Sequence, residues 1–541
     1  MIGLDHLIIV PVLLPLVTAC LMLLLGEQRR SLKAAINLAS TVAILGIAIA
    51  LLRQADAPSV GGAANVGVYL LGNWPAPFGI VLVLDRLSAL MLVLTGILAI
   101  ASLVFSLARW HRAGAHFHPL FQLQLMGLNG AFLTGDLFNL FVFFEVLLAA
   151  SYGLLLHGSS TARVKAGLHY IAINLAASSL FLIGVSLMYS VTGTLNMADL
   201  AVRIPAIADS DRVLVEAAGA ILGIAFLIKA GMWPLCFWLP TTYAAASPPV
   251  AALFAIMSKV GIYVVIRVWL LLFGEQTGTS ALFGSDWLLY GGVMTIVFGS
   301  IGVLASQDMA RLAGYSVLVS TGTLLAVLAT GNTSVTGSAL FYLISSTLAI
   351  SAFFLLLELV ERGRTAGADL LAVTMEAFGD DDFVEDEVGV VIPATMAVLG
   401  ISFICCALLL AGLPPLSGFI AKFALLSALF EPAALEAAPN ATPATAWLLL
   451  GVIVTSGLTV LIAMMRAGIK TFWAPLNRTV PRVRFIEVTP VIVLLLACAT
   501  LTVQAGPVMR YMQTTAASLH TPHGYVNDVL SKPPIPGEGG S

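Results

Sequence analysis

Long apolar runs, separated by short polar or Gly/Pro-containing breaks, recur along most of this 541-residue chain. A helix needs roughly 20 apolar residues to cross a bilayer core, where every backbone N–H and C=O must bond within the chain. Hydrophobic residues make up 59% of the sequence and charged residues 10%, whereas soluble domains average about 25% charged. The sequence therefore predicts an all-α polytopic membrane protein and excludes a soluble globular enzyme.

About fourteen of these runs are long enough to span a membrane. The expected spans lie near residues 7–25, 34–52, 80–108, 118–135, 137–156, 167–190, 213–236, 248–273, 286–306, 311–330, 335–360, 390–430, 445–468 and 487–510. The twelfth run is too long for one straight helix and contains Pro414 and Pro415, so we expect a broken helix there.

Residues 1–510 are therefore expected to form one transmembrane domain. Residues 361–388 are rich in Asp and Glu and are expected to form an acidic cytoplasmic loop. The polar, Pro/Gly-rich composition predicts a disordered tail over 511–541.

Basic residues orient the expected spans. With the N-terminus outside, 15 of the 25 Lys and Arg residues fall in gaps that would be cytoplasmic, and six fall on the other side. This bias predicts that both termini lie on the non-cytoplasmic side of the cell (inner) membrane. Four basic residues are left inside spans: Arg86, Lys229, Lys259 and Lys422. The net charge of −3 argues against a nucleic-acid partner.

No nucleotide-binding, haem-attachment or zinc-protease motif occurs in the sequence, and no cofactor or metal is predicted. The pair His116 and His118 is expected to form an interfacial patch beside nearby arginines rather than a metal site. The five cysteines show no C-x-x-C spacing and are expected to be small packing residues.

Ionisable residues at membrane depth carry the functional information, because a charge at a helix centre costs roughly 2.5–3.5 kcal/mol. Glu145 lies nine positions after Asp136, which is ~13 Å into its span. Lys259 is near the middle of the eighth run. Lys229 and Lys422 belong to proline-interrupted segments, LIKAGMWPLCFWLP and AGLPPLSGFIAKFALL.

The two interrupted segments are the seventh and twelfth spans, five spans apart. An odd offset reverses orientation, so spans 4–8 and 9–13 are expected to form two inverted five-helix repeats. Paired broken helices in inverted repeats indicate an ion site near the membrane midplane.

Burial disfavours the charged form of a lysine and a nearby carboxylate favours it, so a Glu–Lys pair with further lysines is suited to a switchable proton relay. A static ion pair or a snorkelling side chain is the alternative for each residue. For Arg86, pairing with its neighbour Asp85 is the favoured interpretation. The buried hydroxyls of Ser316, Ser345 and Ser346 are explained equally well by bound water or by helix packing.

Four segments resemble the D subunits of the multisubunit Mrp-type (Mnh/Pha) cation/proton antiporters, which are related to the antiporter-like subunits of respiratory complex I. The fifth span, GDLFNLFVFFEVLLAASYGLLL (135–156), resembles span five of that family. Residues 226–268 resemble its broken seventh span and its eighth span, and this motif is highly specific to the superfamily. Residues 84–94 and 412–423 resemble its third and twelfth spans, and the similarity covers about 1–510.

The resemblance implies fourteen helices with two inverted repeats. It also implies a hetero-oligomer with other subunits in the lipid bilayer that exchanges Na⁺ or K⁺ for H⁺. By this resemblance Glu145 and Lys229 are the paired carboxylate and lysine of the first half-channel, Lys259 the central relay lysine and Lys422 the terminal one.

The sequence departs from the family in the eleventh span. Many relatives carry a histidine where this chain reads FYLISSTLAISAFF, with Ser345 and Ser346. The link between Lys259 and Lys422 therefore has no obvious titratable residue. Two alternatives remain, a bridge of hydroxyl-bound water or a path shorter than in the relatives.

Three function classes remain open. The leading hypothesis is an ion-translocating subunit of a cation/proton antiporter, a transporter rather than an enzyme, in which the lysine-rich set favours the proton as the ion that crosses this subunit. The alternative is the proton-pumping membrane subunit of an NADH:quinone oxidoreductase or a membrane-bound hydrogenase, whose redox chemistry lies on other subunits. A non-transporting scaffold is the third, and the cost of four buried charges argues against it.

Overall fold

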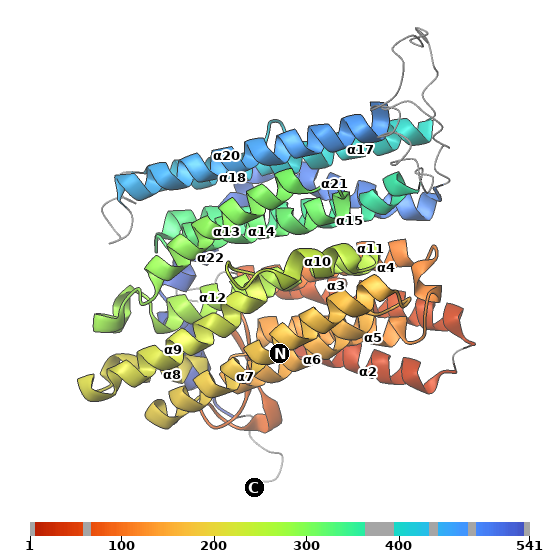
Figure 1. Cartoon of the computed structure of the whole chain (residues 1–541). Helices are drawn as coiled ribbons and strands as arrows, with labels where there is room; N and C mark the ends of the chain where they lie inside the picture. Colours follow the sequence, from red (N-terminus) through yellow and green to blue (C-terminus); the bar gives the residue numbers. More distant parts are fainter. Residues whose placement is uncertain are drawn as a thin grey trace, which may run out of the picture.

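The computed structural model describes residues 6–26, 28–57, 66–362, 394–431, 442–473 and 483–534. Long helices lie side by side in one bundle, with the N-terminal helices at one edge and α17, α18 and α20 at the other (Figure 1). In this part of the chain twelve helices are long and apolar enough to cross a membrane. The predicted class, an all-α polytopic membrane protein, is confirmed.

The helices of the first half of the chain are α2 (Val10–Leu24), α3 (Arg30–Asp56), α4 (Arg86–Ser106), α5 (Phe117–Leu133), α6 (Leu137–Leu155), α7 (Thr161–Thr192), α8 (Met197–Arg203), α9 (Asp209–Ala230), α10 (Trp238–Ala245), α11 (Pro248–Phe254) and α12 (Met257–Leu272). Those of the second half are α13 (Ser285–Ala305), α14 (Met309–Leu328), α15 (Thr333–Glu361), α17 (Ala394–Ala411), α18 (Ser417–Leu429), α20 (Pro443–Gly468), α21 (Phe485–Val503), α22 (Ala505–His520) and α23 (His523–Ser531). Strands β1 (Gly67–Leu70) and β2 (Val81–Leu84) pair antiparallel, with Gly67 opposite Leu84.

Every expected span coincides with one of these helices or with a broken pair of them. The helices α2 and α18 are apolar but shorter than a full span. The count of fourteen crossings and the two inverted repeats stay predictions. The acidic loop predicted over 361–388 lies outside the described residues, apart from its first two.

Both expected breaks are present, and their backbones match. The first residue after α9 is Gly231, with φ of 81°, and the first residue after α17 is Gly412, with φ of 78°. At each break the glycine N–H and the next N–H donate to one carbonyl, that of Leu227 or Leu408, at 2.9 and 3.0 Å. Positive φ at a helix C-terminus favours glycine, which explains why both proline-containing segments break at Ala-Gly.

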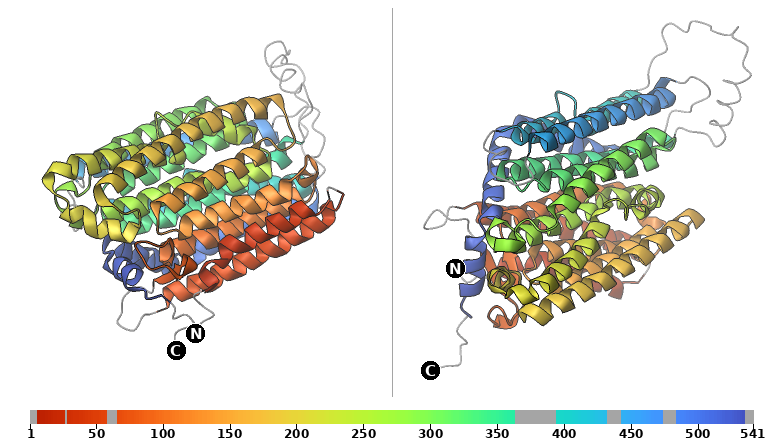
Figure 2. Two further views of the ribbon diagram at one scale, coloured as in Figure 1. Left: turned by 90° about the horizontal axis from the view of Figure 1, so that it is seen from below. Right: turned by 60° about the vertical axis from the view of Figure 1, so that its left-hand side comes forward.

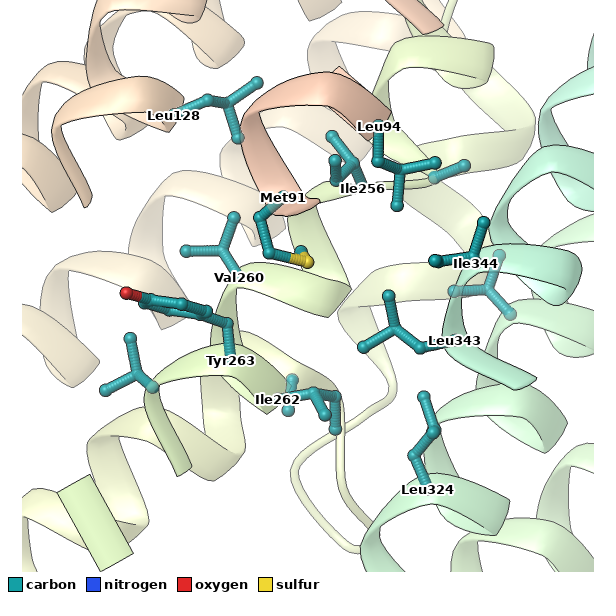
Figure 3. Close-up of a cluster of buried hydrophobic side chains, with 14 of the residues drawn as sticks. Met91, Leu94, Leu128, Ile256, Val260, Ile262, Tyr263, Leu324, Leu343 and Ile344 are labelled. Atoms are coloured by element: carbon teal, nitrogen blue, oxygen red, sulfur yellow. The ribbon is translucent and has the colours of Figure 1, made fainter. Parts of the chain in front are cut away.

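The most buried helices lie where the two halves meet. The α11–α12 segment and α15 each have 94% of their most apolar window buried. Around α12, Val260 and Ile262 pack among Met91 of α4 and Leu343 and Ile344 of α15 (Figure 3). The helix that carries Lys259 is therefore enclosed by protein on all sides rather than facing lipid.

The expectation of a disordered tail from residue 511 is wrong over the described part. The helices α22 and α23 lie across one end of the bundle (Figure 2). Helix α22 packs against α15 and α12, and α23 packs against α8 and β1. These helices are amphipathic, and their apolar residues, among them Met512, Leu519 and Tyr525, are buried. The Pro/Gly-rich end of the sequence obscured this pattern.

The first and last described elements share one end of the bundle, since β1 contacts both η1 (His6–Ile8) and α23. An even number of crossings requires this arrangement.

Candidate functional site

Glu145 lies on α6, which begins after Asp136, whose side chain caps the helix by accepting from the Asn139 N–H at 2.9 Å. The Glu145 carboxylate accepts a hydrogen bond from the Ser178 hydroxyl of α7. It also interacts electrostatically with Lys229 of α9. The structure therefore brings together the predicted carboxylate and lysine of the first half.

Lys229 lies in the last turn of α9, where the negative end of the helix dipole favours a cation. Its Nζ is 5.4 Å from the centroid of the Phe144 ring, a cation–π contact. Among the ion pairs of the described residues none joins Lys229 to Glu145 directly. Their interaction therefore acts through space rather than through a direct ion pair.

A glycine holds α12 against the end of α9. A Cβ at Gly261 would lie 2.5 Å from the Ala230 nitrogen, so no larger residue fits without moving a helix. A cavity of about 20 Å³ lies beside this contact. Its lining includes Phe144, Tyr170, Asn174, Lys229, Trp238, Met257 and Val260. A cavity of roughly 10–15 Å³ holds one water molecule, so a water fits between Lys229 and the helix that carries Lys259.

Lys259 is 0% exposed. Its Nζ donates a hydrogen bond to the Ser320 Oγ of α14 at 2.8 Å, and Ser320 Oγ donates to the Ser346 Oγ of α15 at 2.9 Å. No carboxylate pairs with Lys259 among the described residues. A hydroxyl accepts from an amine as well as from an ammonium, so this contact persists in both protonation states.

Lys422 of α18 is 8% exposed and reaches back across the break in its own span. Its Nζ donates to the carbonyl of Ala411 at 2.9 Å and lies 3.5 Å from that of Leu410. These carbonyls belong to the last turn of α17, where helix carbonyls lack partners in their own helix. Gly457 of α20 leaves room for the ammonium, because a Cβ there would lie 3.2 Å from Nζ.

A second cavity of about 20 Å³ lies between Lys259 and Lys422, at the place where the sequence offers no titratable link. Five hydroxyl-bearing residues line it: Ser316, Ser320, Tyr342, Ser345 and Ser346. Leu410, whose carbonyl faces Lys422, lines it as well. On its far side Ser345 Oγ and Ser417 Oγ are 2.8 Å apart.

Sequence reasoning missed three polar partners of the predicted residues: Ser178, Ser320 and Ser417. Serines are common in apolar helices, where they bond to their own backbone. Neither composition nor helical spacing separates these three from the rest. Only the packing of α7, α14 and α18 against their neighbours identifies them.

The predicted pairing of Arg86 with Asp85 is wrong. Asp85 Oδ2 accepts from Arg267 at 2.6 Å, and Arg86 pairs with Asp56 at 3.2 Å. Asp85 is the N-cap of α4, where its other oxygen accepts from the Ser88 N–H at 2.9 Å. This cap directs the carboxylate into the bundle, while Arg86, the next residue, points to the rim.

Arg267 of α12, the partner of Asp85, is only 7% exposed. Tyr263 and Tyr525 place their rings 5.7 and 5.1 Å from its guanidinium carbon. Tyr525 comes from α23, so the C-terminal helices close over this pair.

Three arginines predicted on the cytoplasmic side meet at the opposite end of the bundle. Arg109, Arg163 and Arg362 line a cavity of about 360 Å³. Glu358 lies among them and pairs with Arg109 at 2.7 Å and Arg362 at 2.6 Å. Three separate loops with predicted positive charge thus lie at one end, as the predicted orientation requires.

The predicted interfacial patch of His116 and His118 is only half correct. His116 is exposed, but His118 is buried on α5 and its Nδ1 lies 2.9 Å from Asn37 Nδ2. The ring centroid of His118 lies 5.6 Å from that of His111, which is also buried.

Comparison with known proteins places this site in a family. Residues 134–438 match the family model described as "NADH:quinone oxidoreductase/Mrp antiporter, TM". The chain belongs to this family. This member of the NADH:quinone oxidoreductase/Mrp antiporter family is 64% identical over 532 residues to the probable K(+)/H(+) antiporter D subunit of Rhizobium meliloti, covering 98% of each chain.

Two further relatives agree. The family member is 33% identical over 534 residues to the Na(+)/H(+) antiporter D subunit of Alkalihalophilus pseudofirmus, covering 98% of this chain and 100% of that one. A chain in the Mrp complex from Dietzia sp. DQ12-45-1b superposes with a TM-score of 0.82 at 26% identity, covering 98% and 100%. The resemblance to the D subunits of Mrp-type antiporters is confirmed.

Proposed function

We propose that this chain is the ion-translocating subunit of a multisubunit monovalent cation/proton antiporter, in which Glu145, Lys229, Lys259 and Lys422 carry protons. One observation carries the proposal: these four charged residues occur in a chain 64% identical, over 98% of its length, to a probable K⁺/H⁺ antiporter D subunit. That relative favours K⁺ over Na⁺ as the exchanged cation.

The partners are the other subunits of the antiporter and the lipid of the cell membrane. Both termini lie on the non-cytoplasmic side. The gathering of Arg109, Arg163 and Arg362 at the end opposite the termini supports this orientation.

The two broken spans are counterparts in two inverted five-helix repeats. The shared Ala-Gly break and the identical hydrogen-bond pattern at Gly231 and Gly412 support this assignment. So does a shared close contact, in which Gly261 lies against Ala230 and Gly457 against Ala411.

Transfer in the first half is controlled by charge. An ionised Glu145 stabilises the ammonium of Lys229, and a proton on Glu145 removes that stabilisation. Lys229 then passes its proton through the water-sized cavity toward α12, the helix that carries Lys259. Lysines repel a passing metal cation, so the proton is the ion that takes this route.

Everted membrane vesicles that contain the intact complex test the proposal. Added K⁺ or Na⁺ collapses an imposed proton gradient in the wild type, and Lys229→Ala and Glu145→Ala abolish the collapse while the complex still assembles. Lys165→Ala, an exposed lysine on α7, serves as the control and retains exchange.

Two results would overturn the proposal. Unchanged exchange in both Lys229→Ala and Glu145→Ala would indicate a scaffold. Co-purification with flavin and iron–sulfur subunits would favour a proton-pumping subunit of a redox complex.

A further inference from the structure

The second half of the candidate path contains a gap in titratable groups. No carboxylate or imidazole lines the cavity between Lys259 and Lys422 in the part of the chain that the structure describes. A proton that reaches Lys259 therefore needs another carrier. Hydroxyl groups and water are the carriers present, since each both donates and accepts hydrogen bonds.

A chain of hydroxyls starts at Lys259 and points away from it. Lys259 Nζ donates to Ser320, and Ser320 donates to Ser346 at 2.9 Å. Ser346 Oγ donates in turn to the Leu343 carbonyl of its own helix at 3.2 Å. Lys259 and Ser320 are thus oriented for release of a proton from Lys259, and the Ser346 hydroxyl must rotate away from the Leu343 carbonyl to continue into the cavity.

The cavity is built to hold one water molecule. Its volume of about 20 Å³ exceeds the roughly 10–15 Å³ that a water needs, and a buried water requires two to four polar partners. Ser320, Ser346 and Ser345 all line it, so these partners are present. A water there joins Ser346 to Ser345, two adjacent residues of α15 that point to different sides of the helix.

On its other side the cavity borders residues that contact or precede Lys422. Ser345 is 2.8 Å from Ser417, the first residue of α18, and Gly418 lines the cavity one turn before Lys422. Leu410 lines it from the other helix, and its carbonyl lies 3.5 Å from Lys422 Nζ. Leu410 therefore lies between the cavity and the Lys422 amine, which also binds the neighbouring Ala411 carbonyl at 2.9 Å.

Bonding within their own helices does not account for the hydroxyls of Ser320, Ser345 and Ser417. A packing serine donates to the carbonyl four residues earlier in its own helix, as Ser316 does to Leu312 at 2.9 Å. Ser320, Ser345 and Ser417 instead bond to serines on neighbouring helices. Buried cross-helix hydroxyl pairs in line between two lysines are the arrangement that a proton wire needs.

We propose that Ser320, Ser346, Ser345 and Ser417, with one water in the cavity, carry protons between Lys259 and Lys422; this rests on the proposed function. The Lys259 ammonium gives a proton to Ser320, each hydroxyl and the water pass on the proton that they held, and the neutral Lys422 amine takes the last one. Lys259 becomes neutral and Lys422 becomes charged, with no net change in the carriers. This hydroxyl bridge replaces the titratable residue that the eleventh span lacks.

Single alanine substitutions in the intact complex, assayed in everted vesicles, test the bridge. Ser320→Ala and Ser346→Ala are expected to lower the cation-dependent proton exchange rate about tenfold or more, with assembly and the half-saturating K⁺ concentration unchanged. Because the carriers act in series, the double variant falls no further than the slower single one. Ser346→Thr keeps the hydroxyl and is expected to restore exchange.

The matched control is Ser351→Ala on the same helix, because the buried Ser351 hydroxyl has no hydrogen-bond partner among the described residues. It retains the wild-type rate. Ser320 and Ser346 lie on different helices, so a folding defect in one variant leaves the other as the test.

The outcomes separate the two proposals. If Lys229→Ala abolishes exchange while Ser320→Ala and Ser346→Ala exchange at the wild-type rate, the hydroxyl bridge is wrong and the proposed function stands. If Ser346→Thr is as slow as Ser346→Ala, the serine acts through packing and the bridge is also wrong. If Lys229→Ala itself exchanges normally, the proposed function fails first.

Discussion

The two broken spans share a backbone but differ in what holds their lysines. Both read Ala-Gly-x-x-Pro-Leu, and in both an ammonium lies at the C-terminal end of the first half-helix. In the first half Lys229 belongs to that helix and acts with Glu145. In the second half its counterpart is Leu410, and Lys422 reaches back from beyond the break to the Leu410 and Ala411 carbonyls.

This difference separates two roles. The helix dipole favours an ammonium near the end of the first half-helix, whichever half-helix supplies the lysine. In the first half the carboxylate of Glu145 interacts with Lys229, whereas the cavity between Lys259 and Lys422 is lined by hydroxyls and by no carboxylate in the described part of the chain. We infer that the first half controls proton release and that the second half conducts.

Removal of the Glu145 carboxylate is expected to lower proton exchange more than any other change that separates the two halves. Glu145→Gln keeps the shape and removes the charge, and we expect proton exchange in everted vesicles to fall about a hundredfold. Ser178→Ala removes only the hydrogen bond to that carboxylate and is expected to lower exchange far less. Equal losses in the two variants would assign the control to the hydrogen bond rather than to the charge.

Moving the lysine from position 422 to position 410 tests whether the end of the helix determines where the ammonium lies. Lys422→Leu is expected to lower exchange about tenfold or more. Adding Leu410→Lys places a lysine at the position that corresponds to Lys229, and we expect it to recover part of the rate. No recovery in an assembled complex would mean that the two breaks are not equivalent.

The two glycines of α20 test the packing around Lys422. Gly457→Ala places a Cβ 2.6 Å from the Ala411 carbonyl oxygen. A Cβ added at Gly451 would have no neighbour within 4 Å. We expect Gly457→Ala to destabilise the protein by about 1–3 kcal/mol and to slow exchange, while Gly451→Ala does neither. Thermal unfolding of the detergent-solubilised complex measures the difference, and equal midpoints would contradict the close contact.

The smallest effect concerns α22, which packs against α12 of the first half and α15 of the second. Burial lowers the pKa of His520 to about 4, and its Nε2 lies 3.0 Å from Thr336 Oγ1 of α15. The folded pKa is below the ordinary value of about 6.5, so the docked helix binds fewer protons than the undocked one. The contribution of His520 to the docking of α22 is complete above pH 6.5 and is lost as the pH falls toward 4.

Between pH 7.5 and pH 5 the docking of α22 is expected to weaken by on the order of 1 kcal/mol, after a discount for partial exposure. Hydrogen–deuterium exchange of α22 in the intact complex, corrected for intrinsic rates, measures this change. His520→Gln is expected to remove it. A pH dependence that persists in this variant would assign the effect to another group.

The sequence was sufficient for the positions of the helices, for the two breaks and for the burial of Lys259 and Lys422, because apolar run length, Ala-Gly-Pro punctuation and the cost of buried charge act locally. It was insufficient for Asp85, which pairs with Arg267 almost two hundred positions away rather than with its neighbour. It was insufficient also for Ser320 and Ser417, whose role depends on which helices are adjacent. The amphipathic tail helices were missed because polar residues outnumber the buried apolar stripe.

Lys259 joins the two halves, and its substitution tests the proton path most directly. Lys259→Met keeps the length and the burial of the side chain and removes the amine. Proteoliposomes with the purified complex report K⁺- or Na⁺-driven proton movement with a pH-sensitive dye. We predict an assembled complex with no cation-dependent proton movement, and movement at the wild-type rate would contradict the path.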